Sequence, residues 1–334
     1  MATLKDVAVL AGVSVKTVSN VVNGYAFVKP ENRRRVEDAL SATGYRPHLG
    51  ARNLRRGRTG FLAFVVPELS IPYFGELAGG VIAAAQPFDW SVLIEQTQGD
   101  RERERATLAS LGPHLVDGAL VSPQAIDAAD LARPGVPVVL LGEHPLALPL
   151  DHVGIDNVRA AHTAVRHLVE LGRRRIAVVG QHPTRGTAAQ RLAGYHRALA
   201  EAGLPRDEAL VAEALRYHHR DGAEAMSVLL DLAEPPDAVF CFNDMLAQGA
   251  IRTAVDRGLR VPDDLAVVGF DNAEHSAFSV PSLTTVAPDK AALARAAVEL
   301  VHRRTTGADF PPREVRIPFT LQVRESTAGP SRPT

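Results

Sequence analysis

The run TLKDVAVLAGVSVKTVSNVVNG, residues 3–24, constrains the fold of this chain more than any other segment. Its first half repeats apolar residues at the spacing of one helical face. These residues are Leu4, Val7, Ala8 and Ala11. Gly12 can end that helix with a left-handed backbone, and Ser14 is a favourable N-cap for a second helix. The run therefore predicts two short helices joined by a tight turn.

The second of these helices, residues 15–23, separates into an apolar stripe and a polar stripe. The inward stripe consists of Val18, Val21 and Val22. The opposite stripe carries no carboxylate and consists of Lys16, Ser19, Asn20 and Asn23. A polar stripe on a helix that starts just after such a turn suits phosphates and base edges. The pattern predicts a helix-turn-helix head that binds DNA.

The charge distribution agrees with this prediction. Residues 1–60 hold eleven Lys/Arg and four Asp/Glu, a charge of +7, whereas the other 274 residues hold 26 basic and 34 acidic residues, a charge of −8. The net charge of −1 therefore conceals a basic arm on a mildly acidic body. Nucleic acid is the natural partner of such an arm. The charge split supports the helix pattern without establishing DNA binding by itself.

A third helix is predicted over residues 28–45, with Pro30 in its first turn and Gly44 at its end. The segment that follows places Leu54 among several arginines and is too short to hold a helix alone. We expect it to become ordered only against a partner. Two interpretations of Leu54 stay open, a linker leucine resting on the body or a wedge between base pairs in the minor groove.

From residue 61 onward, apolar strand-like runs alternate with amphipathic helical runs. The strand-like runs are FLAFVVPE, SVLIEQT, GALVSP, PVVLLG, RIAVVG, AVFCF and LAVVGFD, and the helical runs lie near 75–86, 101–112, 157–172, 188–203, 221–233 and 244–258. This alternation predicts an α/β body with two doubly wound parallel-sheet lobes, the first sheet from the first four runs and the second from residue 175 onward. Segments 283–288 and 315–326 are expected to return across the junction. Such lobes place a ligand cleft at the carboxyl ends of their strands.

Length and composition limit the class of protein. A chain of 334 residues with 46% apolar residues accommodates a small head and a two-lobed soluble body. The N-terminus lacks the apolar core of a signal peptide and no run has the length of a membrane span, so we expect a cytoplasmic protein, associated with the nucleoid when bound to DNA. The single Cys241 lies in a strand-like run and is expected in the core. No histidine pair has zinc-helix spacing, and we expect no metal and no cofactor.

Taken together, the chain resembles the LacI/GalR family of bacterial repressors, which have a periplasmic-binding-protein-like core. The motifs that carry the resemblance are the run at 3–24, GYRPHLGARNLRRGRTG, DHVGIDN, QRLAGY, CFNDMLAQGA, VPDDLAVVGFDN and PSLTTV. The resemblance implies a head at 1–46, a hinge at 47–58, a core at 59–326 and a disordered tail at 327–334. Within the core, the first lobe is expected at about 59–156 plus 288–316 and the second at about 157–287 plus 317–326.

The resemblance also implies DNA contacts. Base contacts are expected from Val15, Lys16, Asn20, Ala51, Leu54 and Arg55. Phosphate contacts are expected from Thr3, Ser14, Thr17, Ser19 and Asn23. The chemistry fits in part, because Lys16 can donate to guanine, Asn20 can pair with adenine and Val15 can touch only a methyl group. Asn20 stands where many relatives have arginine, so the operator sequence cannot be transferred from them.

In the body, the resemblance implies an effector site in the cleft. Its expected residues are Arg191, Asp271, Asn243, Tyr73, Phe74, Tyr217, Thr187 and Arg185. For Phe74 a core position is an equal alternative, and Asn243 and Asp271 could instead cap neighbouring turns. A site of aromatic and polar groups suits a sugar, although a nucleobase or nucleoside corepressor would use similar groups.

The function predicted from the sequence is therefore a repressor that binds a pseudo-palindromic double-stranded DNA operator as a homodimer. A small molecule, expected to be a sugar, controls it from the cleft. The sequence does not show whether that effector releases or tightens DNA binding. A transport-type binding protein would leave the head unexplained. A hydrolase on the same two-lobed fold would need a cluster of catalytic groups that the sequence does not display.

Overall fold

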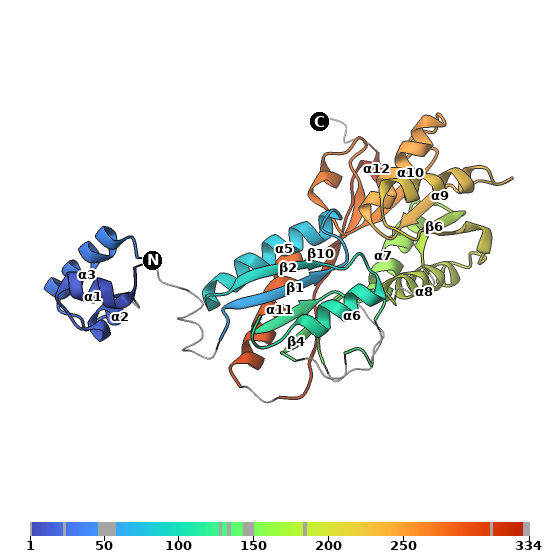
Figure 1. Cartoon of the computed structure of the whole chain (residues 1–334). Helices are drawn as coiled ribbons and strands as arrows, with labels where there is room; N and C mark the ends of the chain where they lie inside the picture. The colour runs from blue at the N-terminus through green and yellow to red at the C-terminus, as the bar shows by residue number, and fades with distance from the viewer. Residues whose placement is uncertain are drawn as a thin grey trace. The chain divides into compact units, whose positions relative to one another are not determined.

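The computed structural model describes residues 2–22, 25–45, 58–126, 129–131, 135–142, 150–182, 186–307 and 310–329. The chain divides into two compact units, Met1–Thr59 and Gly60–Thr334, and each is described by itself. The described part of the first unit is helical, whereas the second unit contains two sheets and their helices (Figure 1). We call residues 2–45 the head and the second unit the core.

The head consists of three helices, α1 (Leu4–Ala11), α2 (Val15–Val22) and α3 (Pro30–Thr43). Gly12 ends α1 with a φ of 62°, and Gly44 ends α3 with a φ of 61°, as the sequence predicts. The guanidinium of Arg35 donates to the Gly12 carbonyl at 3.2 Å and ties α3 to the turn. The buried core of the head is formed by Val7, Ala8, Ala11, Val18, Val21, Val36 and Ala39. The predicted helix-turn-helix is confirmed.

The first lobe is built on a six-stranded parallel sheet with the order β11-β5-β4-β3-β1-β2. Its strands are β1 (Phe61–Val66), β2 (Ser91–Gln96), β3 (Gly118–Val121), β4 (Val138–Leu141), β5 (Asp151–Gly154) and β11 (Glu314–Arg316). Alternate residues of β1 face opposite sides. Leu62 and Phe64 pack in the cluster that also contains residues of α5 (Pro72–Ala85) and α11 (Lys290–Thr305), whereas Ala63 and Val65 pack with residues near α6 (Arg101–Ser110). Helices therefore cover both faces of this sheet.

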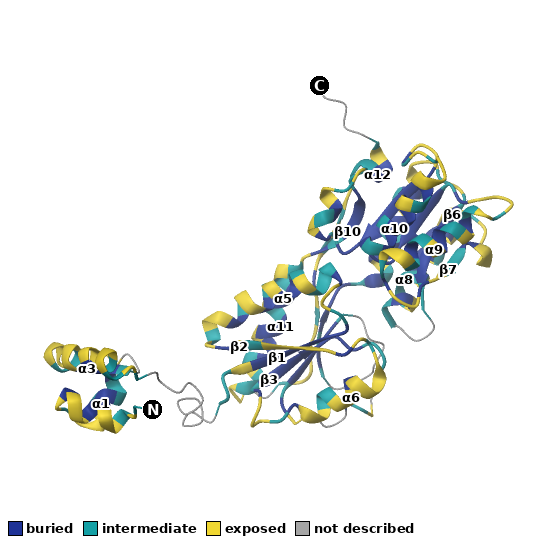
Figure 2. Cartoon of the chain, turned by 45° about the horizontal axis from the view of Figure 1, so that its top comes forward, coloured by how far each residue is buried: buried dark blue, intermediate teal, exposed yellow. Residues whose placement is uncertain are grey.

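The second lobe is built on a sheet with the order β12-β10-β9-β8-β6-β7. Its strands are β6 (Ile176–Gln181), β7 (Val211–Glu213), β8 (Ala238–Cys241), β9 (Ala266–Phe270), β10 (Thr284–Pro288) and β12 (Phe319–Gln322), of which β12 runs antiparallel to β10. Its helices are α7 (Asn157–Glu170), α8 (Gly186–Glu201), α9 (His219–Leu230), α10 (Asp244–Asp256) and α12 (Glu325–Ala328). Buried residues follow the strands and the helix faces turned toward them (Figure 2). Cys241 is among them, as expected.

The chain passes between the two lobes three times, after β5, after β10 and after β11.

The core begins at Gly60, whose N–H donates to the Asp117 carboxylate at 3.1 Å. The same carboxylate accepts from the indole N–H of Trp90 at 2.8 Å. Trp90 is buried just before β2.

The structure adds elements that the sequence did not reveal. The strands β5 and β7 and the helices α11 and α12 were not among the predicted runs. DHVG in β5 and VAE in β7 are too short to show a period. The expected disordered tail begins too early, because Thr327 lies in α12, is buried, and has its hydroxyl 2.9 Å from Nε2 of His167.

Candidate functional site

The head exposes one face of α2. Lys16 and Val15 are exposed and Ser19 and Asn20 are half-buried, while Val18 and Val21 of the same helix are in the core. The polar side of this short helix is therefore more exposed than its apolar side, which packs in the core of the head. Such a face can enter the major groove of DNA, where donors and acceptors on base edges carry sequence information.

The hydroxyl residues predicted to contact phosphates are engaged in local caps. Ser14 caps α2, because its Oγ accepts from the Thr17 N–H at 3.1 Å, and the two hydroxyl oxygens lie 2.9 Å apart. Thr3 caps α1 in a capping box, in which both its N–H and its hydroxyl donate to Asp6 at 2.8 Å. Phosphate oxygens only accept hydrogen bonds, and both the N–H and the hydroxyl of Thr3 already donate to Asp6. A phosphate contact from Thr3 would therefore need to displace Asp6. The predicted positions Asn23, Ala51, Leu54 and Arg55 lie outside the described residues.

The core contains a cavity of about 360 Å³ between its lobes. Seven of the eight residues predicted for the effector site line it: Tyr73, Phe74, Thr187, Arg191, Tyr217, Asn243 and Asp271. The eighth, Arg185, lies outside the described residues. The cavity walls come from segments that follow β1, β2, β3, β4 and β5 in one lobe and β6, β7, β8 and β9 in the other. The cleft thus lies at the carboxyl ends of the strands, where the fold class predicts it.

Arg191 of α8 is fixed on three sides. Its Nε donates to Oδ1 of Asn157 at 2.8 Å, its Nη1 donates to the Phe242 carbonyl, and its guanidinium lies 3.5 Å from the centre of the Phe270 ring. Burial lowers the pKa of Arg191, although nearby Asp271 acts in the opposite direction. A stacked guanidinium held in this way presents its remaining donors in one fixed direction.

Asp271 follows β9 and is 8% exposed. Burial raises the pKa of its carboxyl from 3.8 to about 8, against the lowering effect of Arg191. Within the part of the chain that the structure describes, no hydrogen bond reaches this carboxyl. A desolvated carboxyl that lines a cavity has its hydrogen-bonding capacity available for a ligand.

Three aromatic side chains line the cavity among the predicted residues, Tyr73 and Phe74 from the first lobe and Tyr217 from the second. Tyr73 and Phe74 begin α5 and meet edge to face, with ring centres 5.2 Å apart. Burial raises the pKa of the Tyr73 hydroxyl further above its ordinary value. The hydroxyl of Tyr217 donates to the Gly180 carbonyl at 2.8 Å, which fixes the side chain where it lines the cavity. Phe74 is half-buried and packs against the core, while also lining the cavity.

Asn243 shows the alternative interpretation. Its Oδ1 accepts from the Leu246 N–H at 2.8 Å and caps α10, and its Nδ2 donates to the Tyr217 carbonyl at 2.9 Å. Both ends of the amide are therefore committed within the protein. Asn243 shapes the cavity wall and keeps Tyr217 in place, and we do not retain it as a direct ligand contact.

Sequence reasoning missed several polar residues of the cavity. These are Glu68, Gln98, Asp100, Ser122, Gln124, Asn157, Arg216 and His218. Nε2 of His218 lies 2.9 Å from Oε2 of Glu68, and this pair joins the two lobes. Burial acts to raise the pKa of Glu68, but hydrogen bonds from Ser70 and His218 outweigh it and lower the pKa. All five of the missed first-lobe residues, Glu68, Gln98, Asp100, Ser122 and Gln124, lie within four positions after the end of a strand, which is the signal that could have identified them.

A buried carboxylate shapes the loop that carries Gln124. Glu104 of α6 is 2% exposed and accepts from three consecutive backbone N–H groups, those of Gln124, Ala125 and Ile126, at 2.8 to 3.0 Å. These hydrogen bonds from Glu104 therefore fix the loop after β3 to α6.

Among the described residues there is no cluster of three His, Cys, Asp or Glu side chains suited to a metal. No described helix is long and apolar enough to cross a membrane.

Comparisons with known proteins give matches over both units. Residues 3–48 match the family "Bacterial regulatory proteins, lacI family", and residues 165–327 match a periplasmic binding protein-like domain. The transcriptional regulator DegA of Bacillus subtilis is 34% identical over 98% of both chains.

Solved structures agree. A complex of the transcriptional regulator CelR with cellobiose is 32% identical, with a TM-score of 0.73 over 98% of this chain and 100% of its own. The Lac repressor dimer bound to operator and the anti-inducer ONPF is 26% identical, with a TM-score of 0.87 over 98% of this chain and 99% of its own.

Proposed function

The chain belongs to the LacI family of bacterial regulatory proteins, and we propose that it represses a carbohydrate-utilisation operon as a homodimer controlled by a sugar. The family consists of transcriptional regulators, so the chain is a DNA-binding transcriptional repressor and not an enzyme. The sugar, the operon class, the homodimer and the individual contacts are the proposed parts. We also propose that it acts in the cytoplasm and is associated with the nucleoid when bound to DNA.

The proposed DNA contacts are made by the polar face of α2. Lys16 donates to guanine acceptors, Asn20 pairs with adenine, and Val15 packs on a thymine methyl group. Ser14, Thr17 and Ser19 position the helix on phosphates. The hinge contacts of Ala51, Leu54 and Arg55 rest on the sequence resemblance. In this proposal Leu54 is the minor-groove wedge.

The cavity supports a sugar as the effector. The observation that carries this proposal is the juxtaposition of the Asp271 carboxyl, which no described group engages, with the fixed guanidinium of Arg191. Carboxyl and guanidinium groups bind vicinal hydroxyls, and the rings of Phe74 and Tyr217 offer faces to the C–H side of a pyranose. Tyr73 and Thr187 add hydroxyls. The cellobiose complex of CelR is consistent with a carbohydrate in a cleft of this fold.

The homodimer is supported by exposed apolar residues of the second lobe. Phe278 is 79% exposed and Val280 is 93% exposed, and with Ile251 and Val255 of α10 they line one hollow of the surface. A contiguous apolar patch of this kind marks an interaction surface. The Lac repressor structure is a dimer bound to operator. We therefore propose that this patch meets a second copy of the chain, so that one head addresses each half of the operator.

Control requires the effector to bind one lobe arrangement better than another. In the proposed mechanism, a ligand in the cleft changes the angle between the lobes, and this change decides whether paired hinge segments fold on DNA. An effector that prefers the DNA-binding arrangement is a corepressor, and one that prefers the other arrangement is an inducer.

The test is a thermal-shift screen of the full chain against sugars, sugar phosphates, nucleobases and nucleosides. A ligand at one hundred times its Kd stabilises the folded protein by about 2.7 kcal/mol, which raises the melting temperature by a few degrees. The hit is then added to a binding assay with an operator selected from random DNA. A nucleobase or nucleoside hit replaces the sugar, and a chain that responds to no compound contradicts effector control.

A further inference from the structure

Two oppositely charged side chains of the first lobe meet at the junction with the second. Lys290 is the first residue of α11, and its ammonium lies 2.5 Å from Oε2 of Glu76 in α5. The side chains are 16% and 32% exposed, respectively. The helices α5 and α11 pack against each other, so the pair belongs to one rigid face of the first lobe.

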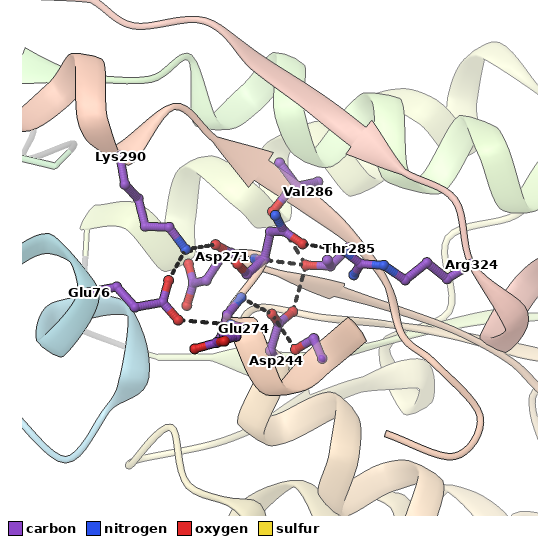
Figure 3. A network of polar contacts seen from close by, with 11 residues as sticks. Glu76, Asp244, Asp271, Glu274, Thr285, Val286, Lys290 and Arg324 are labelled. Carbon is purple, nitrogen blue, oxygen red and sulfur yellow. Dashed lines mark hydrogen bonds and ion pairs between the residues drawn. The ribbon is translucent and has the colours of Figure 1, made fainter. Parts of the chain in front are cut away.

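Both members of this pair form hydrogen bonds with a turn of the second lobe, residues 271–274, which directly follows β9 (Figure 3). The ammonium of Lys290 donates to the carbonyls of Asp271 and Asn272 at 2.8 and 2.9 Å. Oε1 of Glu76 accepts from the Glu274 N–H at 2.8 Å. All three protons of the ammonium therefore have acceptors, and three backbone groups of one turn are held by the opposite lobe.

The second lobe holds other groups of the same turn. The N–H of Asp271 donates to the Val286 carbonyl at 2.8 Å, and the N–H of Ala273 donates to Oδ2 of Asp244 at 2.8 Å. Arg324 donates to the side-chain oxygen of Asn272 at 2.7 Å. The division is clear in Figure 3, where Arg324 and Asp244 approach the turn from its own lobe and Lys290 from the other.

The turn needs such support because its backbone is strained. Asp271 has a φ of 105° and Asn272 a φ of 48°, and both are residues with a Cβ in the left-handed half of the map. Conformations of this kind persist only when surrounding contacts determine them, and they gather at functional sites. The same residue, Asp271, carries the carboxyl that lines the cavity.

We propose that Lys290 and Glu76 are a positioning pair that holds the strained turn and so aims the Asp271 carboxyl at the effector. Because the pair belongs to the first lobe and Asp271 to the second, the aim of Asp271 depends on the arrangement of the lobes. Effector affinity and lobe arrangement are thereby coupled through contacts that the effector does not touch. This inference rests on the proposed role of Asp271 as an effector contact.

The first arm of the test needs no ligand. Hydrogen exchange of the full chain is followed by mass spectrometry for wild type, Lys290→Met and Glu76→Gln. Lys290→Met should speed exchange of the 270–276 amides by about tenfold while leaving β6 and β8 unchanged. Glu76→Gln keeps an acceptor for Glu274 and should have a smaller effect. Arg166→Met, which removes a surface ion pair within α7, is the matched control and should leave the turn unchanged.

The second arm measures binding of cellobiose and a panel of other sugars by calorimetry. For any sugar that binds wild type, Lys290→Met should weaken affinity by about tenfold, the loss expected for a coupling free energy of ordinary size. If no sugar binds wild type, the proposed effector class fails, whereas the exchange arm still decides the positioning role. Exchange of the turn within twofold of wild type, or equally faster exchange throughout the second lobe, would overturn the inference.

Discussion

The polar face of α2 and the cleft of the core both present polar side chains to a ligand, but they hold them in opposite ways. On α2, Lys16 is exposed and Asn20 half-buried, and only the apolar side of the helix is fixed by the core of the head. In the cleft, Arg191 is half-buried and Asp271 is buried, and the Arg191 side chain and the Asp271 backbone are each fixed by several contacts. Side chains on α2 can therefore change rotamer when DNA binds, whereas the side chains of the cleft are preorganised before a ligand binds.

The largest expected effect is unfolding of the head while the core stays folded. Val18→Asp places a carboxylate in a core that excludes water, at a site with 0% exposure. Burying an unpaired charge costs about 3 kcal/mol or more, which exceeds what a seven-residue core can lose. We expect operator binding to vanish in fluorescence anisotropy while ligand binding by the core stays unchanged. Val9→Asp, the same change at an 83% exposed position of α1, is the control and should leave the head folded.

The second expected effect breaks the cleft alone. Arg191→Ala removes the guanidinium that contacts Asn157 and Phe270, and it leaves Lys290 as the remaining positive charge near Asp271. Effector affinity should fall by about a hundredfold, as when one member of a buried charged pair is removed. Calorimetry measures this loss, and anisotropy should show operator binding that no longer responds to the effector. Arg197→Ala, on the exposed face of the same helix, should behave as wild type.

A third, smaller effect sharpens the description of the head. Asn20→Ala should weaken binding to the selected operator by about tenfold, because a good side-chain contact to one base contributes roughly 1–3 kcal/mol of discrimination. Binding to unrelated DNA should change little, since it depends on phosphates. Competition binding with both DNAs measures the ratio. Equal weakening on both would assign Asn20 to the phosphate backbone, and Asn32→Ala in α3 controls for head stability.

The smallest effect concerns the pH dependence of the ligand-free core. The Asp271 carboxyl has a pKa of about 8 in the fold, against an ordinary value of 3.8, so between these pH values the folded state binds more protons than the unfolded state. Stability therefore falls as pH rises through this window, by up to about 1 kcal/mol per pH unit. Asp244, with a pKa raised to about 6, contributes below that value.

Asp271→Asn should flatten the decline of melting temperature between pH 7 and 8, where most of Asp244 is already ionised. Differential scanning calorimetry at a series of pH values measures the slope. A slope unchanged by the substitution would mean that the carboxyl is ionised in the folded core.

The two regions also differ in how far the sequence alone predicts them. The head is local, because the turn at Gly12 and the stripes of α2 arise from neighbours within one or two helical turns. Its helices and their inward faces were therefore predicted correctly. In the cleft, Glu68 and His218 are 150 positions apart, and no periodicity connects them. Their meeting depends on the packing of two lobes, which a sequence pattern does not encode.

Asn243 illustrates the limit within a single motif. The segment CFND places a polar residue just after a strand, which fits both a ligand contact and a helix cap. Only the position of the Tyr217 carbonyl and the Leu246 N–H decides between them, in favour of the cap. Lys290 is a similar case, since its sequence position marks a helix start and gives no sign of the turn that it holds in the other lobe.

The hydrogen bonds around Asp117 make the fluorescence of Trp90 an intrinsic probe of the start of the core. Trp90 is the single tryptophan of the chain, and it shares one carboxylate with Gly60, the residue where the hinge segment enters the core. Indole emission depends on hydrogen bonding and on the charges nearby. A displacement of the hinge entry therefore changes the fluorescence of the unlabelled wild-type chain. In the proposed mechanism the effector signal passes through this hinge entry, and stopped-flow measurement of Trp90 emission should follow it in real time.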